Sequence, residues 1–407
     1  MSPSPTLSVP AFGSPAWYQN PYRGYRAWLD SGQRAVRLSP HLVAVTQYRD
    51  CLDILRDPRL SAKRYVGKLA HYTEEEKREL SSWQGSSAKQ MFFLDPPDHP
   101  RIRKPLMRAF SPEAIAALEP RIQAVFRDIL DRVPSGVEID FMRSIAHPFP
   151  AQVIGEMLGV PPDAWGQLTR WSDLFIEFFA GFQSPIEVGR RANQANTEML
   201  EYLSELIELK RAQAGSDVLS VMMHAVDSGD SLTRDELLAQ GVLLLIAGHE
   251  TTRNLIGNGM LTLLRHPEQM EMLRRDRTLL RGAIEEMLRY EGPLQGTSRL
   301  ALEDFEFDGE KIPAGQSLFA AMGCANRDQR QFADPDRFDI ARRNNPHLDF
   351  GAGAHACLGL HLARLEARIA FGALLDRYER IELCEEDPQW APALTLRGLK
   401  RLNVAVS

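Results

Sequence analysis

Apolar residues recur at helical spacing along most of the chain. The segment SPEAIAALEPRIQAVFRDILDRV begins with Ser111 as a helix N-cap and Pro112 at the first helical position, and its apolar residues then follow the helical period. The same periodicity returns in segments that begin near Phe141, Asp163, Pro185, Leu232, Pro267, Leu279 and Leu358. The pattern predicts a mainly helical protein.

Two regions instead show the short alternating runs that are typical of strands. Residues 35–46, AVRLSPHLVAVT, predict a hairpin around a Ser-Pro turn. Residues 296–322 contain the runs SRLAL, FEF, KIP and SLFAAM, which Asp-Gly and Ala-Gly turns separate. We therefore expect a small sheet within a helical fold. No repeat or low-complexity linker divides the chain, so we expect residues 1–407 to form one domain.

Composition narrows the class of protein. Of 407 residues, 44% are hydrophobic and 25% charged, which is typical of a folded globule. The net charge of -6 is spread over interleaved acidic and basic residues without a basic block, so nucleic acid is not an expected partner. The N-terminus lacks the features of a signal peptide, and no apolar run is long enough to span a bilayer. We therefore expect no membrane partner.

The four cysteines indicate the redox state of the protein's compartment, and one of them lies in a candidate binding site. Cys51, Cys324, Cys357 and Cys384 stand far apart without a CxxC pair, which favours neither a disulfide framework nor a zinc ribbon. This usage is typical of a reducing, cytoplasmic location. Cys357 differs from the other three because it lies in FGAGAHACLG, residues 350–359, directly before a predicted helix.

Three ordinary interpretations of this loop are available. A phosphate-binding loop would need a Lys-Ser/Thr pair or a third spaced glycine, which the segment lacks. A zinc site could use His355, Cys357 and His361, but no fourth ligand is evident. A buried cysteine that only packs is the commonest fate of a free thiol.

A metal-bound thiolate is the fourth interpretation, and the local physics favours it. The free N–H groups and the macrodipole at a helix start stabilise negative charge, and therefore the thiolate of Cys357. Gly351 and Gly353 let the backbone turn tightly and approach a flat ligand, while Phe350 can cover the sulfur. The loop is therefore suited to a planar cofactor.

FGAGAHACLG also matches, at every specified position, the haem-binding signature of the cytochrome P450 family. Four further motifs occur in the family's order and cover most of the chain: DPPDHPRIR (residues 95–103), AGHETT (247–252), EEMLR with Glu286 and Arg289, and ANRD with DPDRFD (325–339). The chain therefore resembles a soluble bacterial P450. The resemblance implies a mainly α fold, a helical triangular prism with a small β-rich subdomain.

The resemblance implies haem b, iron protoporphyrin IX, between the helix that contains AGHETT and the helix that follows the cysteine loop. Cys357 would be the axial iron ligand. The other cofactor-binding residues implied are His99, Arg103, Ala247, Arg299, Phe350, His355 and Gly359. Of these, His99, Arg103, Arg299 and His355 would donate to the propionates.

Glu286 and Arg289 have two interpretations. Their spacing is also that of an ordinary surface ion pair on a helix. In relatives of the family, this pair ties its helix to the meander before the cysteine loop, which would make it structural. Arg337 and Arg342 are both candidates for the meander residue that completes the network.

The most informative helix is predicted over Leu232–Leu264, 33 residues or about 50 Å. Its centre, VLLLIA, is apolar on all sides and must be buried, yet Gly248, His249, Glu250, Thr251 and Thr252 follow at once. The Thr251 hydroxyl can reach the carbonyl of Ala247 four residues earlier, which predicts a local kink.

By resemblance, Glu250 and Thr251 are the catalytic acid–alcohol pair that delivers protons during dioxygen activation. The implied enzyme is a haem-thiolate monooxygenase, which inserts one oxygen atom into a C–H or C=C bond and releases the other as water. A peroxide-driven peroxygenase of the same fold is one alternative, but such relatives lack the threonine. A haem-binding sensor or carrier is another, and it would not need the Glu250–Thr251 pair.

Apolar residues without a structural period suggest the substrate pocket. WQGSSAKQMFF and WSDLFIEFFAGFQSP, which includes Phe182, are rich in aromatic residues that core packing would explain equally well. With the family's positions as a guide, the predicted substrate-binding residues are Phe92, Phe179, Leu244, Gly248, Leu294, Gln295, Leu394 and Thr395. We expect a hydrophobic secondary metabolite, such as a polyketide, macrolide or terpenoid, with Gln295 or Thr395 contacting a polar substituent.

Electrons should come from a separate ferredoxin and ferredoxin reductase, because the chain carries no flavin or iron–sulfur motif. Lys104, Arg108, Arg364 and Arg368 could form a basic docking face, or could be solvated helix charges. A helix predicted from Pro100 contains Pro105, which should bend or restart it and leaves the direction of Arg103 open.

Overall fold

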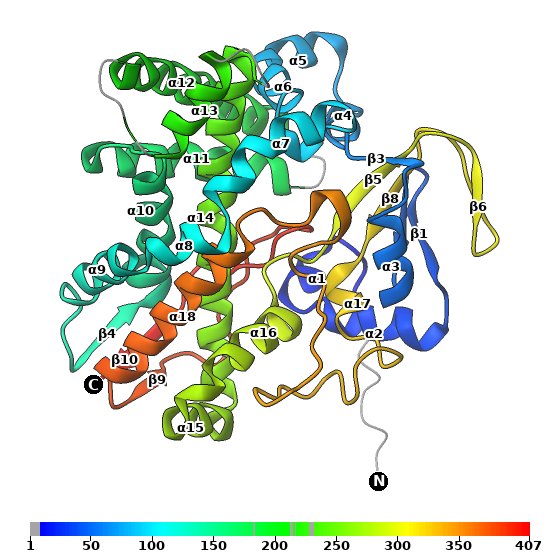
Figure 1. Ribbon diagram of the computed structural model, residues 1–407. Helices are drawn as coiled ribbons and strands as arrows, with labels where there is room; N and C mark the ends of the chain where they lie inside the picture. Colours follow the sequence, from blue (N-terminus) through cyan, green and yellow to red (C-terminus); the bar gives the residue numbers. More distant parts are fainter. Residues whose placement is uncertain (1–8, 182–183, 212–214, 216, 228–231) are drawn as a thin grey trace.

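The computed structural model describes residues 9–181, 184–211, 215, 217–227 and 232–407. Most helices gather on one side of the molecule, while the largest sheet lies on the other side with the N-terminal helices (Figure 1). The mainly α prediction is confirmed. The helices are α1 (Pro15–Gln19), α2 (Tyr22–Ser31), α3 (Tyr48–Ile54), α4 (Tyr65–Leu69), α5 (Glu74–Glu79), α6 (Ser81–Ser87), α7 (Asp98–Ala109), α8 (Pro112–Ala117), α9 (Glu119–Leu130), α10 (Pro148–Met157), α11 (Trp165–Ala180), α12 (Ile186–Arg211), α13 (Val218–Asp227), α14 (Arg234–Arg265), α15 (Pro267–Arg275), α16 (Leu280–Glu291), α17 (Met322–Ala325) and α18 (Leu360–Arg377).

The predicted sheet near residue 300 is present. It has the order β1-β2-β8-β5-β3, with β2 and β8 parallel and the other pairs antiparallel. A separate hairpin, β6-β7, turns at Asp308 and Gly309, both with positive φ, as an Asp-Gly turn favours. These strands are β1 (Ala35–Ser39), β2 (Leu42–Val45), β3 (Leu60–Ser61), β5 (Thr297–Ala301), β6 (Phe305–Phe307), β7 (Glu310–Ile312) and β8 (Ser317–Ala320).

A third sheet was not predicted from the sequence. It joins β4 (Val137–Asp140), β10 (Asn403–Val406) and β9 (Ile381–Leu383) in that order, with antiparallel pairing. Each strand has only three or four residues, and β4 pairs with a strand more than 260 residues away in the sequence. Such short non-local strands leave no periodic pattern that a sequence reading can detect.

Helix α14 is the axis of the helical side. It has 32 residues, about 48 Å, and begins with a capping box in which Thr233 and Glu236 satisfy each other's backbone N–H groups. Helices α10, α11, α12, α16 and α18 all pack against it. Because other helices surround α14, it can be apolar on nearly every side. This agrees with the burial predicted from its apolar centre, VLLLIA. The helix runs unbroken through Gly248, so the expected kink does not interrupt it.

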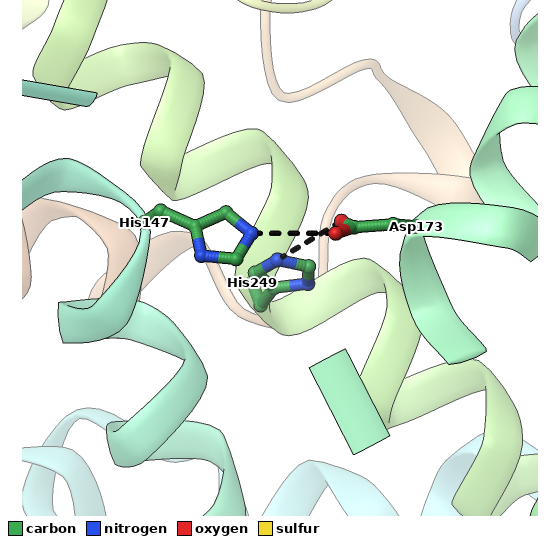
Figure 2. Close-up of side chains that lie close together, drawn as sticks. All are labelled: His147, Asp173 and His249. Carbon is green, nitrogen blue, oxygen red and sulfur yellow. Dashed lines mark ion pairs between the residues drawn. The ribbon is translucent and has the colours of Figure 1, made fainter. Parts of the chain in front are cut away.

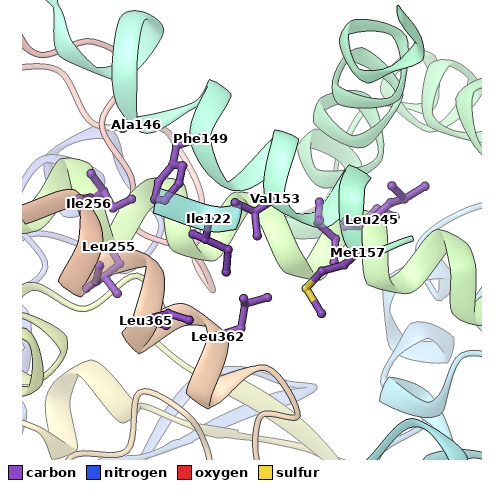
Figure 3. Packing of buried hydrophobic residues seen from close by; sticks show 14 of the residues in the cluster. Ile122, Ala146, Phe149, Val153, Met157, Leu245, Leu255, Ile256, Leu362 and Leu365 are labelled. Carbon is purple, nitrogen blue, oxygen red and sulfur yellow. The ribbon is translucent and has the colours of Figure 1, made fainter. Parts of the chain in front are cut away.

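The core between α9, α10, α14 and α18 fixes the start of α18 beside α14. Figure 3 shows Leu362 and Leu365 of α18 packed among Ile122 of α9, Phe149 and Val153 of α10, and Leu255 and Ile256 of α14. All of these side chains are buried. Burial of one such side chain stabilises the fold by about 1.5–3 kcal/mol. The loop directly before α18, which carries Cys357, is therefore anchored to the central helix.

Prolines account for two differences from the predicted helices. The segment after Ser111 is two helices, α8 and α9, because Pro120 in the first turn of α9 lacks the N–H that a continuous helix would need. Ser111 does cap α8, as predicted, since its hydroxyl accepts the N–H of Ala114. Pro105, in contrast, lies inside α7 and does not restart it, so of the two predicted outcomes the restart is wrong.

Candidate functional site

The cysteine loop owes its shape to two glycines and a set of backbone hydrogen bonds. Gly351 and Gly353 have φ of +66° and +71°, in the left-handed region that glycine adopts without strain. The N–H of Cys357 donates to the carbonyl of Phe350 at 2.8 Å, and that of Gly351 to Leu348 at 2.7 Å. The loop is therefore a preformed turn that presents Cys357 three residues before the first residue of α18.

Cys357 is half-buried, whereas Cys51 and Cys324 are fully buried. Burial raises the pKa of the Cys357 thiol, while the backbone N–H of Gly359 and the charge of Arg103 act in the opposite direction. The helix start therefore assists the thiolate less than the sequence predicted, because desolvation is the larger effect. A coordinated cation would supply the remaining stabilisation, since a metal deprotonates the thiol that binds it.

Four predicted propionate donors, together with Arg64, form a cationic cluster beside this loop. The rings of His99 and His355 lie 4.1 Å apart, and Arg103 donates to the carbonyl of Ala356 at 2.7 Å. Arg299 is buried and donates to the carbonyl of Ser298. The sequence therefore identified residues that the fold does bring together.

The three arginines of this cluster have no ion-pair partner among the described residues. Burial, together with the charges of His99, Arg299, Arg64 and Arg103, lowers the pKa of His355 to about 3. Burial also lowers the pKa of Arg299 to about 10. Among the described residues, no ion pair joins a carboxylate to Arg64, Arg103 or Arg299, and Asp95 acts on Arg299 only from a longer distance. The buried Nε2 of His99 likewise has no hydrogen-bond partner.

This donor set fits haem b. Two propionate carboxylates would supply the negative charge and the acceptors that the cluster lacks. A half-buried cysteine on a glycine turn suits an axial iron ligand. The predicted zinc alternative is not supported, because His355, Cys357 and His361 do not form a metal-sized group; within the described ranges, the group of that kind is His147, Asp173 and His249.

Arg64 is a cation that the sequence analysis missed. It donates to the backbone carbonyl of Phe92 and stacks on the Phe92 ring, 3.6 Å from the centroid. Burial strongly lowers its pKa, and the charge of Arg299 adds to this effect. No local pattern distinguishes Arg64 from other surface arginines, because its neighbours come from distant segments.

The centre of α14 exposes one narrow stripe. Ala247 is exposed and Gly248 and Thr251 are half-exposed, although the residues around them on this helix are buried. The Thr251 hydroxyl donates to the carbonyl of Ala247 at 3.1 Å, as predicted. A Cβ on Gly248 would lie 2.7 Å from Ile154, so this glycine allows α10 to approach closely rather than presenting a side chain to a ligand.

Glu250 is buried and points toward Arg253 rather than Thr251. Its Oε1 accepts from Arg253 at 2.9 Å and from Asn254 at 3.2 Å. Burial raises the pKa of Glu250, although Arg253 opposes the shift. A raised pKa makes a carboxyl group better able to hold a proton that it can then transfer. Arg253, three residues after Glu250, is a partner that helical spacing alone could have suggested.

The Glu286–Arg289 pair is part of a buried network and not a surface ion pair. Both side chains are fully buried, and two hydrogen bonds of 2.8 Å join them. Arg342 donates to both oxygens of Glu286, whereas Arg337 contributes only its carbonyl, which accepts from Arg289. Of the two candidates, Arg342 is therefore the meander residue whose side chain completes the Glu286–Arg289 network. Asn345 and the N–H of Asp339 also donate to Glu286.

The two aromatic segments predicted to roof the pocket do meet. The rings of Phe92 and Phe93 each lie 5.9 Å from that of Phe179, and Phe92 is 38% exposed. Trp83 and Phe178 contact each other and are fully buried, so they belong to the core. Phe182 lies outside the described residues.

The remaining predicted pocket residues differ in their surroundings. Leu244 is buried and Leu294 half-buried. Gln295 is buried, and its amide accepts from Tyr25 and donates to the carbonyl of Gly292. Leu394 packs in the small core with Trp17 and Phe319 under the N-terminal helices. Thr395, in contrast, has a hydroxyl oxygen that is buried without a partner.

Of the four residues in the predicted basic docking face, two are engaged in ion pairs within the protein. Arg364 donates twice to Glu285, at 2.6 and 2.7 Å, and Arg368 pairs with Glu119 at 2.8 Å. These two arginines are therefore paired within the fold, although their side chains are 34% and 47% exposed. Lys104 and Arg108 on α7 are exposed. None of the described helices is sufficiently long and apolar to cross a membrane.

Comparisons with known proteins agree with this geometry. The family model described as Cytochrome P450 matches residues 167–400. The chain is 41% identical to Cytochrome P450 107B1 of Saccharopolyspora erythraea over 88% of each chain, and 36% identical to the polyketide biosynthesis cytochrome P450 PksS of Bacillus subtilis over 89% of this chain and 88% of that one. The solved structure of P450BioI with an acyl carrier protein that carries hexadec-9Z-enoic acid matches with a TM-score of 0.89 and 34% identity, over 96% of this chain and 100% of that chain.

Proposed function

The chain belongs to the cytochrome P450 family of haem b monooxygenases, and we propose that it hydroxylates or epoxidises a medium to large hydrophobic molecule of bacterial biosynthesis, such as a polyketide, macrolide or terpenoid. The observation that carries the substrate class is the meeting of Phe92, Phe93 and Phe179 from segments far apart in the sequence. A partly exposed aromatic surface of this kind binds apolar ligands. The name of the polyketide biosynthesis relative adds support.

We assign Cys357 as the axial ligand and the cationic cluster, His99, Arg103, Arg299 and His355, as the propionate donors. Haem b, when bound, supplies the redox chemistry that activates dioxygen. Within the chain, the positive φ of Gly351 and Gly353 fixes the turn that presents the thiol. Ala247, Phe350 and Gly359 complete the proposed cofactor contacts. Because the cluster lacks a carboxylate of its own within the described ranges, the propionates would neutralise it.

Proton delivery is assigned to Glu250 and Thr251. Thr251 lies on the exposed stripe of α14 and holds its proton on the Ala247 carbonyl, a weak bond that a stronger acceptor in the pocket can replace. Glu250 lies on a different side of α14, where Arg253 connects it to the partly exposed Asp173. This arrangement suits a carboxyl group that receives protons from the surface.

We further propose a separate ferredoxin with its reductase as the electron source. The positions of two basic residues support this proposal. Exposed Lys104 and Arg108 share α7 with Arg103, whose guanidinium bonds to the carbonyl directly before Cys357. An acidic partner on this face would therefore lie beside the cysteine loop. Reduction by an acidic ferredoxin should slow as salt rises, and more steeply in the wild type than in a Lys104→Ala, Arg108→Ala variant.

The substrate class is tested by ligand-induced shifts of the haem absorption band in a screen of polyketides, macrolides, terpenoids and fatty acids. For the best ligand, Phe92→Ala and Phe179→Ala should each weaken binding about fivefold or more, with non-additive effects in the double variant because the rings touch. Leu302→Ala, at an exposed residue beyond β5, is the matched control. If neither phenylalanine variant changes the affinity of any ligand, the proposed pocket is wrong.

The proton-delivery assignment has its own test. Thr251→Ala should divert reducing equivalents to hydrogen peroxide while substrate binding stays unchanged, and Thr251→Ser, which retains a hydroxyl, should restore most of the coupling. Equal peroxide yields from the wild type and Thr251→Ala would show that Thr251 does not deliver protons. That outcome would leave the proposed substrate class unaffected.

A further inference from the structure

Three side chains from three helices converge at a point outside the predicted haem site. His147 is the residue before α10, Asp173 lies on α11 and His249 on α14. Figure 2 shows the two imidazole rings and the carboxylate directed toward one another. One ligand atom from each residue lies within 4.8 Å of the other two.

Two of these atoms are buried without a hydrogen-bond partner. They are Nε2 of His249, whose side chain is only 2% exposed, and Oδ1 of Asp173. The two atoms are 3.8 Å apart, too far for a hydrogen bond, and Nε2 of His147 lies 3.5 Å from the other carboxylate oxygen. A buried polar atom without a partner is costly, which indicates that something absent from the protein chain satisfies it.

The orientation of the rings also suits a ligand. Nδ1 of His249 lies 3.3 Å from the hydroxyl of Ser172, and this contact directs Nε2 toward Asp173. A histidine that binds a metal through one nitrogen commonly engages the other in such a contact. Asp173 and His147 are partly exposed, with 44% and 28% of their side chains accessible, so an ion can enter from solvent.

We propose that His147, Asp173 and His249 form a binding site for a divalent transition ion with the preferences of Zn²⁺. Two imidazole nitrogens and a carboxylate are a ligand set that zinc accepts, with water in the fourth position. Zinc bonds of about 2.1 Å place tetrahedral ligand atoms about 3.4 Å apart, so the side chains must close in slightly. His147 precedes its helix and is partly exposed, which gives it the freedom to do so.

One cation competes for this site. Arg253 lies 3.6 Å from Oδ1 of Asp173 and also donates to Glu250 at 2.9 Å. A bound ion would displace Arg253 from Asp173 and leave it with Glu250. The ion would also join α10, α11 and α14, and α11 carries Phe179. The expected consequences are therefore a higher melting temperature and a fixed position of α11 against the central helix.

Calorimetric titration of the tag-free, chelator-treated haem protein with ZnCl₂ tests the proposal. We expect one Zn²⁺ per chain, and at least tenfold weaker binding in His147→Ala and in Asp173→Asn, because each removes a ligand. His224→Ala, at an exposed histidine of α13, should bind as the wild type does. Zinc should raise the melting temperature of the wild type and the His224 variant only.

Diffraction from zinc-soaked crystals at the zinc absorption edge provides a test that does not depend on variants. An anomalous peak between the two imidazoles and Asp173 would establish the site, and the haem iron can be distinguished by its own absorption edge. Equal zinc affinity in the wild type and both ligand variants, or a zinc peak only elsewhere, would overturn the proposal.

Discussion

Replacement of Arg289 by methionine should destabilise the fold more than replacement of Arg342, the other arginine that binds Glu286. Arg289 is fully buried, donates twice to Glu286, and also donates to the carbonyls of Asn326, Pro335 and Arg337. Removal of one partner from a buried ion pair costs about 3–5 kcal/mol, because the other charge is left without compensation. Glu286 would keep Arg342, Asn345 and one backbone N–H, so we expect the lower end, about 3 kcal/mol.

Arg342→Met should destabilise the fold less than Arg289→Met does. Arg342 is 11% exposed and its loss leaves the Glu286–Arg289 pair intact, so the expected cost is about 1.5–2 kcal/mol, as for hydrogen bonds to a charged group. Arg343→Met, at the exposed neighbouring arginine, is the matched control and should stay within about 0.5 kcal/mol of the wild type.

The assay is thermal unfolding followed by far-ultraviolet circular dichroism. For a chain of this length, we expect a melting temperature lower by roughly 3–4 °C for Arg289→Met and by roughly 2 °C for Arg342→Met. Haem retention should fall in the same order, because the network holds the segment that leads into the cysteine loop. Two results would refute this reasoning. One is an Arg289→Met variant with the same melting temperature as the Arg343→Met control, and the other is an Arg342→Met variant that melts at a lower temperature than Arg289→Met.

Three further predictions concern the cofactor site and pH. Cys357→His should abolish the strongly red-shifted absorption of the ferrous carbonyl complex, and an unchanged spectrum would exclude Cys357 as the axial ligand. Arg299→Ala and His355→Ala should each speed haem transfer to apomyoglobin severalfold, whereas Arg59→Ala, at an exposed pair with Asp57, should not. Hydrogen bonds from His347 and Arg364 overcome the effect of burial and lower the pKa of Glu285 to about 2, so this carboxylate stabilises the fold above its unfolded pKa, about 4.3, and the effect is lost as the pH falls toward 2. Glu285→Gln should therefore cost about 2 kcal/mol in urea unfolding at pH 7 and clearly less at pH 3.5, and a constant difference across this range would contradict the assignment.

Most of the helices after residue 97, the hairpin at residues 35–46, the small sheet near residue 300 and the cysteine loop could be predicted from the sequence. These depend on local causes: apolar residues at the helical period, N-caps such as Ser111, and glycines that tolerate positive φ at residues 351 and 353. The Thr251 bond to Ala247 was predictable for the same reason, because both groups lie on one helix four residues apart.

The directions of side chains and the distant groups that they contact could be learned only from the packing of the folded chain. The choice of Arg342 over Arg337, the turn of Gln295 toward Tyr25, and the place of Arg64 beside Phe92 all depend on contacts between segments separated by tens to hundreds of residues. The convergence of His147, Asp173 and His249 has the same origin, since each lies on or beside a different helix. A sequence pattern fixes which face of an element is buried, but only the packing of one element on another fixes which atoms come within bonding distance.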